Sequence, residues 1–409
     1  MSAKSKSGAG EVVTATAPIG ESRPRTIWIL LLSLSFGGAE RTAVDLVNGL
    51  SDERFEVVVW TVFDTNPLAA RLDDDVTHRS LGVAAATGDD PYEIRGAAHP
   101  RMYLLAPLRF VRAVRRERPA VVHSFLFYEN LICRFAGVVA PETAVVNGER
   151  GFHNSTRTLL HLLDRLTLAF TDVIVSNSRA GAQHYLDRGV EWADLRVIPN
   201  GRRLRDYRDA SDPGLLAELG IPRDALVVGT VGRLVERKGQ FDLLRSWPRV
   251  TESVSDGHLV VVGYGPERDA LETLAGELDI DSTVHFLGSR DDVPELLDAM
   301  DLFAFPSHWE GLPGALLEAM AAGLPIVATE AHGNVELVSD GDTCLMVRPR
   351  DPVSLGDAIA RLGTDRQLAS ELGDRAQAEA FERYTLDAMV ERFESLYEEL
   401  TSPATAHHR

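Results

Sequence analysis

Short apolar runs alternate with amphipathic stretches along most of the chain. In the first half, the runs with the length and composition of buried strands are Thr26–Leu32, Phe55–Thr61, Ala120–His123, Thr143–Asn147, Val173–Ser176 and Leu195–Pro199. Between them, apolar residues recur at helical spacing, for example in Glu40–Leu50 and Pro107–Glu117. Strands that alternate with helices in this way predict parallel sheets covered by helices.

The second half starts the same rhythm again. Its predicted strands are Leu226–Val231, His258–Gly263, Val284–Leu287, Leu302–Phe305, Pro325–Thr329 and Cys344–Val347. The pattern therefore predicts an α/β protein with two Rossmann-like, doubly wound domains joined by the polar segment Gly201–Ile221. We expect a disordered leader at residues 1–25, domains at 26–205 and 206–385, a last helix at 386–400 and a tail at 401–409.

Composition narrows the class of protein. The chain has 409 residues, of which 44% are hydrophobic and 25% charged, as in a globular protein with a large core. The apolar run Ile27–Leu34 is well short of the roughly 20 residues that span a bilayer. The first 26 residues lack the apolar segment of a secretory signal, and Cys133 and Cys344 are the only cysteines. These features favour a cytoplasmic location.

The charge is large and unevenly distributed. A net charge of -19 disfavours nucleic acid as a partner, because phosphates would be repelled. Residues 91–210 nevertheless contain 18 arginines, no lysine and 12 acidic residues. This basic stretch is either a set of solvated helix faces or a surface that meets an anionic ligand or membrane.

The most informative segment is Asp301–Thr329, DLFAFPSHWEGLPGALLEAMAAGLPIVAT. A strand is followed by a loop, and Pro313 stands where a helix is expected to begin. Glu310 then lies on the loop and Glu318 more than one turn inside the helix, so both carboxylates can face one ligand across the helix mouth. The backbone N–H groups of Gly311, Leu312 and Gly314 are expected to be donors for phosphate or sugar oxygens at the positive end of the helix dipole. The alternative is a surface loop and a core helix with incidental glutamates.

This segment resembles the E-x7-E signature of the family-4 glycosyltransferases, which are retaining enzymes of the GT-B fold that use nucleotide sugars. Further motifs of that family appear in the same order, and together they cover the chain from about residue 26 to 400. They are GGAER at Gly37–Arg41, VVHSF at Val121–Phe125, IPNG at Ile198–Gly201, VGRLVERKG at Val231–Gly239, VGYGPER at Val262–Arg268 and HFLG at His285–Gly288.

The resemblance implies a retaining, metal-independent hexosyltransferase. It would move a sugar from a UDP- or GDP-linked donor to a glycan or lipid-linked saccharide, in the assembly of cell-surface polysaccharide, glycolipid or glycoprotein glycan. The donor is a co-substrate, so no cofactor is expected. The second domain would bind the nucleotide sugar, and the last helix would cross back to the first domain. The expected partners are therefore the nucleotide sugar and the saccharide acceptor, and the net charge argues against nucleic acid. Peripheral contact with an anionic membrane at the inner face of the cell membrane stays open.

The resemblance also assigns roles to residues of the cleft between the domains. Arg233 and Lys238 would hold the leaving nucleoside diphosphate, whose charge grows as the glycosidic bond breaks. Glu318 would accept hydrogen bonds from the ribose hydroxyls, and Glu310 would orient the donor sugar.

On the first domain, the resemblance makes His123 the sugar-facing histidine and the second catalytic residue beside Glu310. Gly38 follows the first strand, where a glycine lets backbone amides approach a diphosphate. The alternative readings are a structural histidine and a simple tight turn.

The acceptor side is expected in the first domain. The segment Pro107–Pro119 places Leu108, Val111 and Val114 on one stripe among arginines that include Arg112 and Arg115, which fits either a membrane-surface helix or an ordinary packed helix. Arg150 and Asn200 are further candidates. Arg202 and Arg203 depart from the family, in which a small apolar residue and aspartate commonly follow IPNG.

Two other functions remain open from the sequence. One is a nucleotide-sugar epimerase on the same fold, and the other is a non-catalytic carbohydrate-binding partner of transferase ancestry. The acidic runs Asp73–Asp75 and Asp89-Asp90 resemble metal-binding pairs, but they fall in predicted loops and are interpreted as solvated charge.

Overall fold

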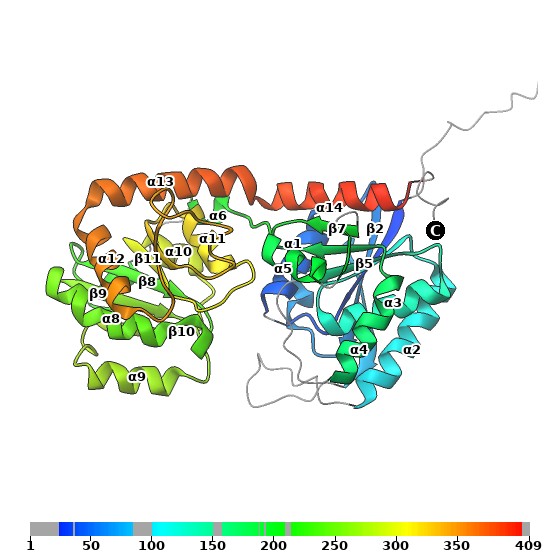
Figure 1. Ribbon diagram of the computed structural model, residues 1–409, viewed down its shortest axis with the longest axis horizontal. Helices are drawn as coiled ribbons and strands as arrows, with labels where there is room; N and C mark the ends of the chain where they lie inside the picture. Colours follow the sequence, from blue (N-terminus) through cyan, green and yellow to red (C-terminus); the bar gives the residue numbers. More distant parts are fainter. Residues whose placement is uncertain are drawn as a thin grey trace, which may run out of the picture.

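The computed structural model describes residues 24–35, 37–84, 100–149, 158–187, 189–191, 194–208 and 214–402. Most of the expected leader and tail, as well as Arg150 and Asp89-Asp90, therefore lie outside the described residues. The described residues form two α/β domains that lie side by side (Figure 1).

The N-terminal domain is built on a parallel sheet, which in the described residues has seven strands in the order β3-β2-β1-β4-β5-β6-β7. The strands are β1 Arg25–Leu31, β2 Phe55–Phe63, β3 Thr77–Val83, β4 Val121–Ser124, β5 Ala144–Glu149, β6 Val173–Ser176 and β7 Leu195–Val197. The helical segments are α1 Gly38–Gly49, η1 Pro67–Arg71, α2 Pro100–Glu117, α3 Phe127–Val139, α4 Thr158–Thr167, η3 Leu168–Phe170 and α5 Arg179–Leu186.

Both faces of this sheet are covered, and β1 shows how. Its side chains alternate between the two faces, so Ile27 and Ile29 join a core under α1 and α14, whereas Trp28 and Leu30 join a core under α2 and α3. This double burial explains why the strand reads as a continuous apolar run in the sequence.

The C-terminal domain has a second parallel sheet, which in the described residues has six strands in the order β10-β9-β8-β11-β12-β13. The strands are β8 Leu226–Val231, β9 Gly257–Val262, β10 Val284–Gly288, β11 Leu302–Phe305, β12 Ile326–Thr329 and β13 Leu345–Val347. The helical segments are η5 Glu236–Lys238, α8 Gln240–Ser253, α9 Arg268–Glu277, α10 Val293–Asp298, α11 Gly314–Ala321, α12 Pro352–Thr364 and α13 Arg366–Arg383. The short helices α6 Arg205–Arg208 and α7 Leu215–Glu218 lie between the two sheets in sequence. The predicted fold class, with two Rossmann-like domains, is confirmed.

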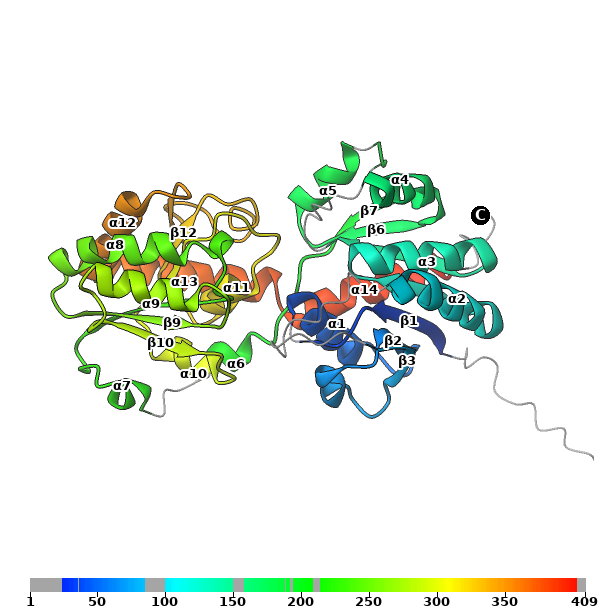
Figure 2. The same cartoon turned by 90° about the horizontal axis from the view of Figure 1, so that it is seen from below.

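The chain crosses between the domains twice. At the second crossing, α13, which runs along the C-terminal domain, is followed by α14, Leu386–Leu400. Helix α14 lies across the N-terminal domain (Figures 1 and 2). Met389, Phe393 and Tyr397 of α14 are buried in the same core as β1. The polar edge of α14 is also fixed, because Glu394 accepts a hydrogen bond from the Ser51 N–H and pairs with Arg54.

Two details differ from the sequence-based expectation. The strand β3 was not predicted, because THRSLGV at the edge of the sheet is mostly polar and exposed. Helix α2 begins at Pro100 and contains Pro107, and its buried stripe is Ala106, Phe110 and Val114. The predicted stripe through Leu108 was wrong, since Leu108 is 68% exposed on the opposite side of the helix.

Candidate active site

A cavity of about 360 Å³ lies between the two domains, and we call it the donor cavity. The N-terminal domain contributes the glycine turn before α1, and the C-terminal domain contributes loops that follow β8, β9 and β10 and the first turns of α11. Its lining residues are Gly37, Gly38, Arg41, Arg202, Val231, Gly232, Arg233, Val262, Gly263, Tyr264, Ser289, Arg290, Val293, Gly314, Ala315 and Glu318. Four arginines against one glutamate give the wall a positive charge, as a diphosphate would require.

The helix mouth lies where β11 ends and α11 begins. Pro313 is the N-cap residue with extended backbone, and Gly314 is the first helical residue. Glu318 is therefore one turn inside α11, where its side chain lines the donor cavity and is only 14% exposed. Glu310 lies on the preceding loop and is buried. As expected, the break at Pro313 leaves Glu310 on the loop and Glu318 in the helix.

Lys238 and Glu310 form a direct ion pair. The Lys238 Nζ is 2.6 Å from Glu310 Oε1, and Arg237 Nη1 is 3.4 Å from Glu310 Oε2. Lys238 also lies over the Phe305 ring, with 5.1 Å between Nζ and the ring centroid. Burial lowers the pKa of Lys238, while the charge of Glu310 opposes that change. The pair thus places a partly desolvated cation and a carboxylate together at the end of β11.

A left-handed glycine fixes the position of this lysine. Gly239 has φ of +72°, and a Cβ atom there would lie 2.0 Å from the Pro306 carbonyl oxygen. Only glycine permits both the backbone angle and this close approach. The same two loops are joined by a hydrogen bond from the His308 N–H to the Arg237 carbonyl, 2.8 Å long. The loop of Lys238 is therefore held against the loop of Glu310.

A second close approach, between Gly263 and Gly232, joins the motifs VGYGPER and VGRLVERKG. Gly263 has φ of +145°, and a Cβ atom there would lie 1.8 Å from the Gly232 carbonyl oxygen. The loops after β8 and β9 consequently pack backbone against backbone at the donor cavity. Gly232 and Gly263 both line the donor cavity, so this close approach shapes its wall.

The expected donor-binding residues are distributed over both sides of the site. Gly38 and Arg233 line the donor cavity from the N- and C-terminal domains, respectively. A Cβ atom on Gly38 would contact nothing within 4 Å, so this position is open toward the cleft. Gly311 packs on Gly333 through its carbonyl oxygen, and the adjacent Leu312 lines a separate cavity of about 510 Å³.

His123 is not where the resemblance placed it. His123 is 0% exposed, and its ring stacks on the Phe125 ring with the two centroids 4.6 Å apart. Its Nδ1 is 2.8 Å from the Tyr397 hydroxyl of α14. The alternation of β4 explains this, because Val121, His123 and Phe125 share the face that α14 covers. The ring is therefore enclosed in the core under α14 and does not face the cleft as the resemblance implies.

Two of the four expected acceptor residues lie apart from the donor cavity. Arg112 and Arg115 are exposed on α2, which occupies the side of the N-terminal domain away from the C-terminal domain (Figures 1 and 2). Asn200 is buried in the segment after β7. Arg150 lies outside the described residues.

Sequence reasoning missed several residues of the site. Arg41, Arg202 and Arg290 line the donor cavity, and Arg237 contacts Glu310. Arg41 and Arg237 stand inside the quoted motifs GGAER and VGRLVERKG, and that position could have indicated them. Arg290 follows the quoted motif HFLG by two residues, but that motif itself gave no reason to choose it.

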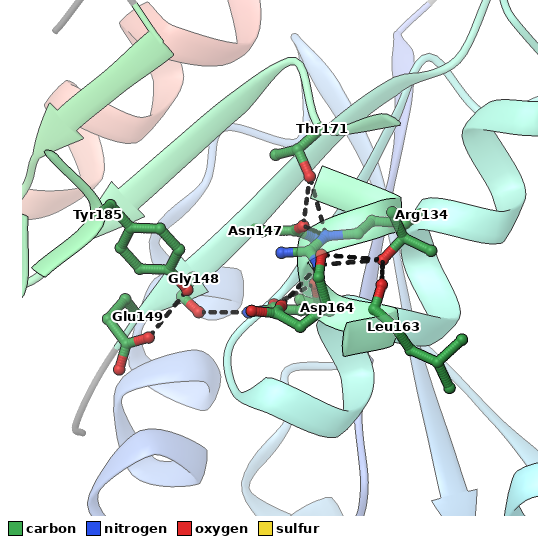
Figure 3. A network of polar contacts seen from close by, with 11 residues as sticks. Arg134, Asn147, Gly148, Glu149, Leu163, Asp164, Thr171 and Tyr185 are labelled. Carbon is green, nitrogen blue, oxygen red and sulfur yellow. Dashed lines mark hydrogen bonds and ion pairs between the residues drawn. The ribbon is translucent and has the colours of Figure 1, made fainter. Parts of the chain in front are cut away.

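The N-terminal domain contains a buried polar network (Figure 3). The Arg134 guanidinium is fully buried, and its Nη1 donates to Asp164 Oδ1 at 2.7 Å. Its Nε donates to Asn147 Oδ1 at 2.7 Å, and the Tyr185 hydroxyl donates to Glu149 at 3.0 Å. These bonds join α3, α4, α5 and β5, and Glu149 is the last residue of β5.

The described residues contain no group of three His, Cys, Asp or Glu side chains that could hold a metal ion. Within the same ranges, no helix has both the length and the apolar character needed to cross a bilayer.

Comparison with known proteins defines the class. Residues 36–205 match the family model described as "Glycosyltransferase Family 4", and residues 225–365 match "Glycosyl transferases group 1". The chain is 29% identical to the lipopolysaccharide core biosynthesis glycosyltransferase LpsE of Rhizobium meliloti, over 87% of this chain and 94% of that protein. It is 26% identical to the UDP-Gal:alpha-D-GlcNAc-diphosphoundecaprenol alpha-1,3-galactosyltransferase of Escherichia coli, over 88% of this chain and 93% of that protein.

A solved structure shares the architecture. The crystal structure of Anabaena Alr3699/HepE in complex with UDP and glucose has a TM-score of 0.77 at 22% identity, covering 92% of this chain and 100% of that one. Two facing Rossmann-like domains with this topology define the GT-B fold. The family matches and the relatives identify the chain, more closely, as a glycosyltransferase of that fold.

Proposed function

We propose that the protein is a retaining hexosyltransferase that takes its sugar from a UDP- or GDP-linked donor. The observation that carries this proposal is the Lys238–Glu310 pair at the end of β11, beside an arginine-lined cavity that contains Glu318. The relatives that act in lipopolysaccharide core biosynthesis or on a diphosphoundecaprenol-linked sugar, and the UDP bound to the structural neighbour, support a nucleotide sugar as donor.

In this proposal the donor diphosphate lies across the helix mouth. Arg233, Lys238 and the first N–H groups of α11 would stabilise the negative charge that develops as the bond between sugar and phosphate breaks. Glu318 would hold the ribose hydroxyls, and Glu310 would orient the sugar and stabilise its oxocarbenium-like state. Retention would follow from attack on the face that the diphosphate leaves, with a phosphate oxygen taking the acceptor proton.

The test is the release of nucleoside diphosphate from a panel of UDP- and GDP-sugars with lipid-linked and soluble saccharide acceptors. Glu310→Gln and Lys238→Met should each lower kcat/KM at least a hundredfold, while the exposed controls Glu330→Gln and Arg361→Met stay near wild type. Nuclear magnetic resonance of the product should show the anomeric configuration of the donor.

Several results would contradict the proposal. Near-wild-type transfer in both site variants would remove the assigned site. Donor binding without diphosphate release under every acceptor would favour a non-catalytic carbohydrate-binding partner, and acceptor-independent conversion of the donor would favour an epimerase.

The proposal needs no divalent ion, because protein cations meet the charge on the diphosphate. Transfer should therefore continue in EDTA at the rate measured with added Mg²⁺. A loss in EDTA that Mg²⁺ restores would contradict metal independence.

We also propose that the enzyme works at the cytoplasmic face of an anionic membrane, where a lipid-linked acceptor would be found. Exposed apolar side chains occur on α2, α3, α4 and η3, of which α3 contacts the other three, and α2 also carries the exposed Arg112 and Arg115. We call this the apolar face, and it consists of Leu105, Leu108, Phe135, Val138, Leu162, Leu163, Leu166 and Phe170.

The apolar face can be tested with vesicles. The protein should sediment with phosphatidylglycerol vesicles more than with phosphatidylcholine vesicles, and 0.5 M salt should weaken the binding. Leu166→Asp should reduce it at least fivefold. Val353→Asp, at a valine of similar exposure on α12 of the other domain, is the control. Equal sedimentation of the two variants would contradict this interface.

A further inference from the structure

Arg202 stands where the chain departs from the family that it resembles, and it lies at the junction of both domain crossings. Its N–H donates to the Tyr384 carbonyl at 3.1 Å, and its carbonyl accepts from the Leu386 N–H at 2.8 Å. Arg202, where the chain first crosses between the domains, is thus hydrogen-bonded to the residues before and after Thr385, where the chain crosses back. The backbone here has little freedom to move the side chain away from the cleft.

The side chain reaches both domains. Arg202 Nη1 donates to the Thr42 hydroxyl at 3.1 Å and lies 3.5 Å from Asp45 Oδ2, both on α1. On the other side, Arg202 Nε is 3.7 Å from Glu318 Oε1 on α11. Only 9% of the residue is exposed, so its charge is largely withdrawn from water and depends on these partners.

Arg202 also forms a partition in the cleft. A second cavity of about 450 Å³ lies beside the donor cavity, and we call it the side cavity. Arg41, Arg202 and Glu318 line both cavities. A Cβ atom on Gly314 would lie 3.0 Å from Arg202 Nη2, so the guanidinium rests against the first turn of α11. A small apolar residue at position 202 would leave this space open.

Glu318 has a second neighbour that fixes it. The Tyr207 hydroxyl donates a hydrogen bond to Glu318, and burial together with the Glu318 charge raises the pKa of Tyr207. The carboxylate is therefore held by a hydroxyl and faced by a guanidinium, which limits its rotamers before any ligand arrives.

We propose that Arg202 is a donor-positioning residue that orients Glu318, closes the rear wall of the donor cavity and ties this wall to α1 of the opposite domain. This inference rests on the proposed function, because Glu318 is assigned there to the donor ribose. In this chain, donor affinity depends on a link between the domains at residue 202. A residue that acts in this way changes donor binding in the ground state and the transition state alike, so KM rises more than kcat falls.

The experiment compares Arg202→Met with Arg203→Met in the full chain. Arg203 is the adjacent, exposed arginine, so the control makes the same chemical change one residue away. Titration calorimetry measures the Kd of UDP and GDP, and steady-state kinetics separates KM for the donor from kcat. Arg202→Met should raise both Kd and KM at least fivefold while kcat stays within threefold. Arg202→Lys, which keeps the charge without the fork, should be intermediate, and Arg203→Met should match wild type.

The N-terminal end of the link is tested separately. Thr42→Val removes the acceptor on α1 and should weaken nucleotide binding two- to fivefold. Combined with Arg202→Met, it should add nothing, because the interaction it removes is already lost. Fully additive effects would contradict the link between the domains. If Arg202→Met does not fold, Arg202→Lys and Thr42→Val carry the test on their own.

The outcomes separate this inference from the proposed function. A wild-type protein that binds neither UDP nor GDP and transfers no sugar would overturn the proposed function. A wild-type protein that binds the nucleotide, with Arg202→Met binding it equally well, would overturn the positioning role alone. A lower melting temperature with unchanged Kd and KM would also overturn it, because that is the result of a purely structural arginine.

Discussion

At the scale of single residues, Glu129 is expected to make the stability of the folded protein depend on pH. Its side chain is fully buried at the start of α3, and its Oε1 accepts a hydrogen bond from the Leu32 N–H at 2.9 Å. Burial raises the pKa of Glu129 from 4.5 to about 7, and the nearby Glu40 carboxylate acts in the same direction. The folded protein therefore holds a proton that the unfolded chain releases at lower pH.

The stability of the protein should fall as the pH rises through this range. The contribution of a raised acid pKa is fully present below about pH 4.5 and is lost as the pH passes about 7. A shift of this size corresponds to on the order of 3 kcal/mol. Glu129→Gln cannot titrate at this position. From pH 5 to pH 8 the unfolding free energy of the wild type should therefore fall relative to that of the variant.

Chemical denaturation at several pH values measures this difference. The exposed Glu53→Gln is the control and should follow wild type at every pH. A constant difference between wild type and Glu129→Gln across the range would show that Glu129 ionises normally in the folded protein.

The positions of several candidate site residues were predictable where neighbouring residues in the sequence determine them, and their roles stay predictions. The helix break at Pro313 separates Glu310 from Glu318, and Lys238 stands in the quoted motif VGRLVERKG. In the structure Glu318 lines the donor cavity. Lys238 pairs with Glu310 and lies within 4 Å of where a Cβ atom on the cavity residue Gly232 would stand. The expected position of His123 facing the cleft was wrong. A strand residue faces one side or the other of its sheet, and a single sequence does not say which side the last helix covers. Arg202 was noticed only as a departure, since its contacts join residues far apart in the chain.

At the scale of elements, the buried Arg134 network joins α3 to α4 and β5 (Figure 3). Replacing one member of a buried ion pair leaves the other charge poorly compensated and costs about 3–5 kcal/mol. Arg134→Leu should therefore lower the unfolding free energy by about that amount, because Asp164 would lose the guanidinium at 2.7 Å.

A matched set of variants isolates the charge from the loss of packing. Arg134→Leu with Asp164→Leu should recover much of the loss, since no charge is then buried without its counter-ion. The exposed Arg165→Leu on the same helix as Asp164 should change the unfolding free energy by less than about 0.5 kcal/mol. Urea unfolding measures all three, and a double variant less stable than Arg134→Leu would contradict the charge explanation.

Elements were predictable to the extent that they are buried. The strands of both domain centres show continuous apolar runs because helices cover both faces, and the expected ranges agree with β1, β2, β4 and all six strands of the second described sheet to within a few residues. The polar edge strand β3 has no such pattern. In α2 the apolar residues are spread around the helix, because Leu108 belongs to the exposed apolar face while Phe110 is in the core.

At the scale of the whole molecule, α14 makes the N-terminal domain dependent on the end of the chain. Phe393 is 0% exposed, and its ring lies 5.4 Å from the His123 ring and 6.0 Å from the Tyr397 ring. These rings fill the same core as Ile27 and Ile29 of β1. The first domain is thus completed only after the second domain and its last helix have been added.

Phe393→Ala should therefore destabilise the opposite domain. Truncation of a buried phenylalanine costs about 3–5 kcal/mol, and the cavity would open between α14 and β4. Hydrogen exchange should rise first in β1 and β4, while β8 and β11 of the C-terminal domain keep their protection. The exposed Glu391→Gln, on the same helix, should leave both patterns unchanged. Faster exchange confined to the C-terminal domain would mean that α14 stabilises its own domain and not the one that it crosses.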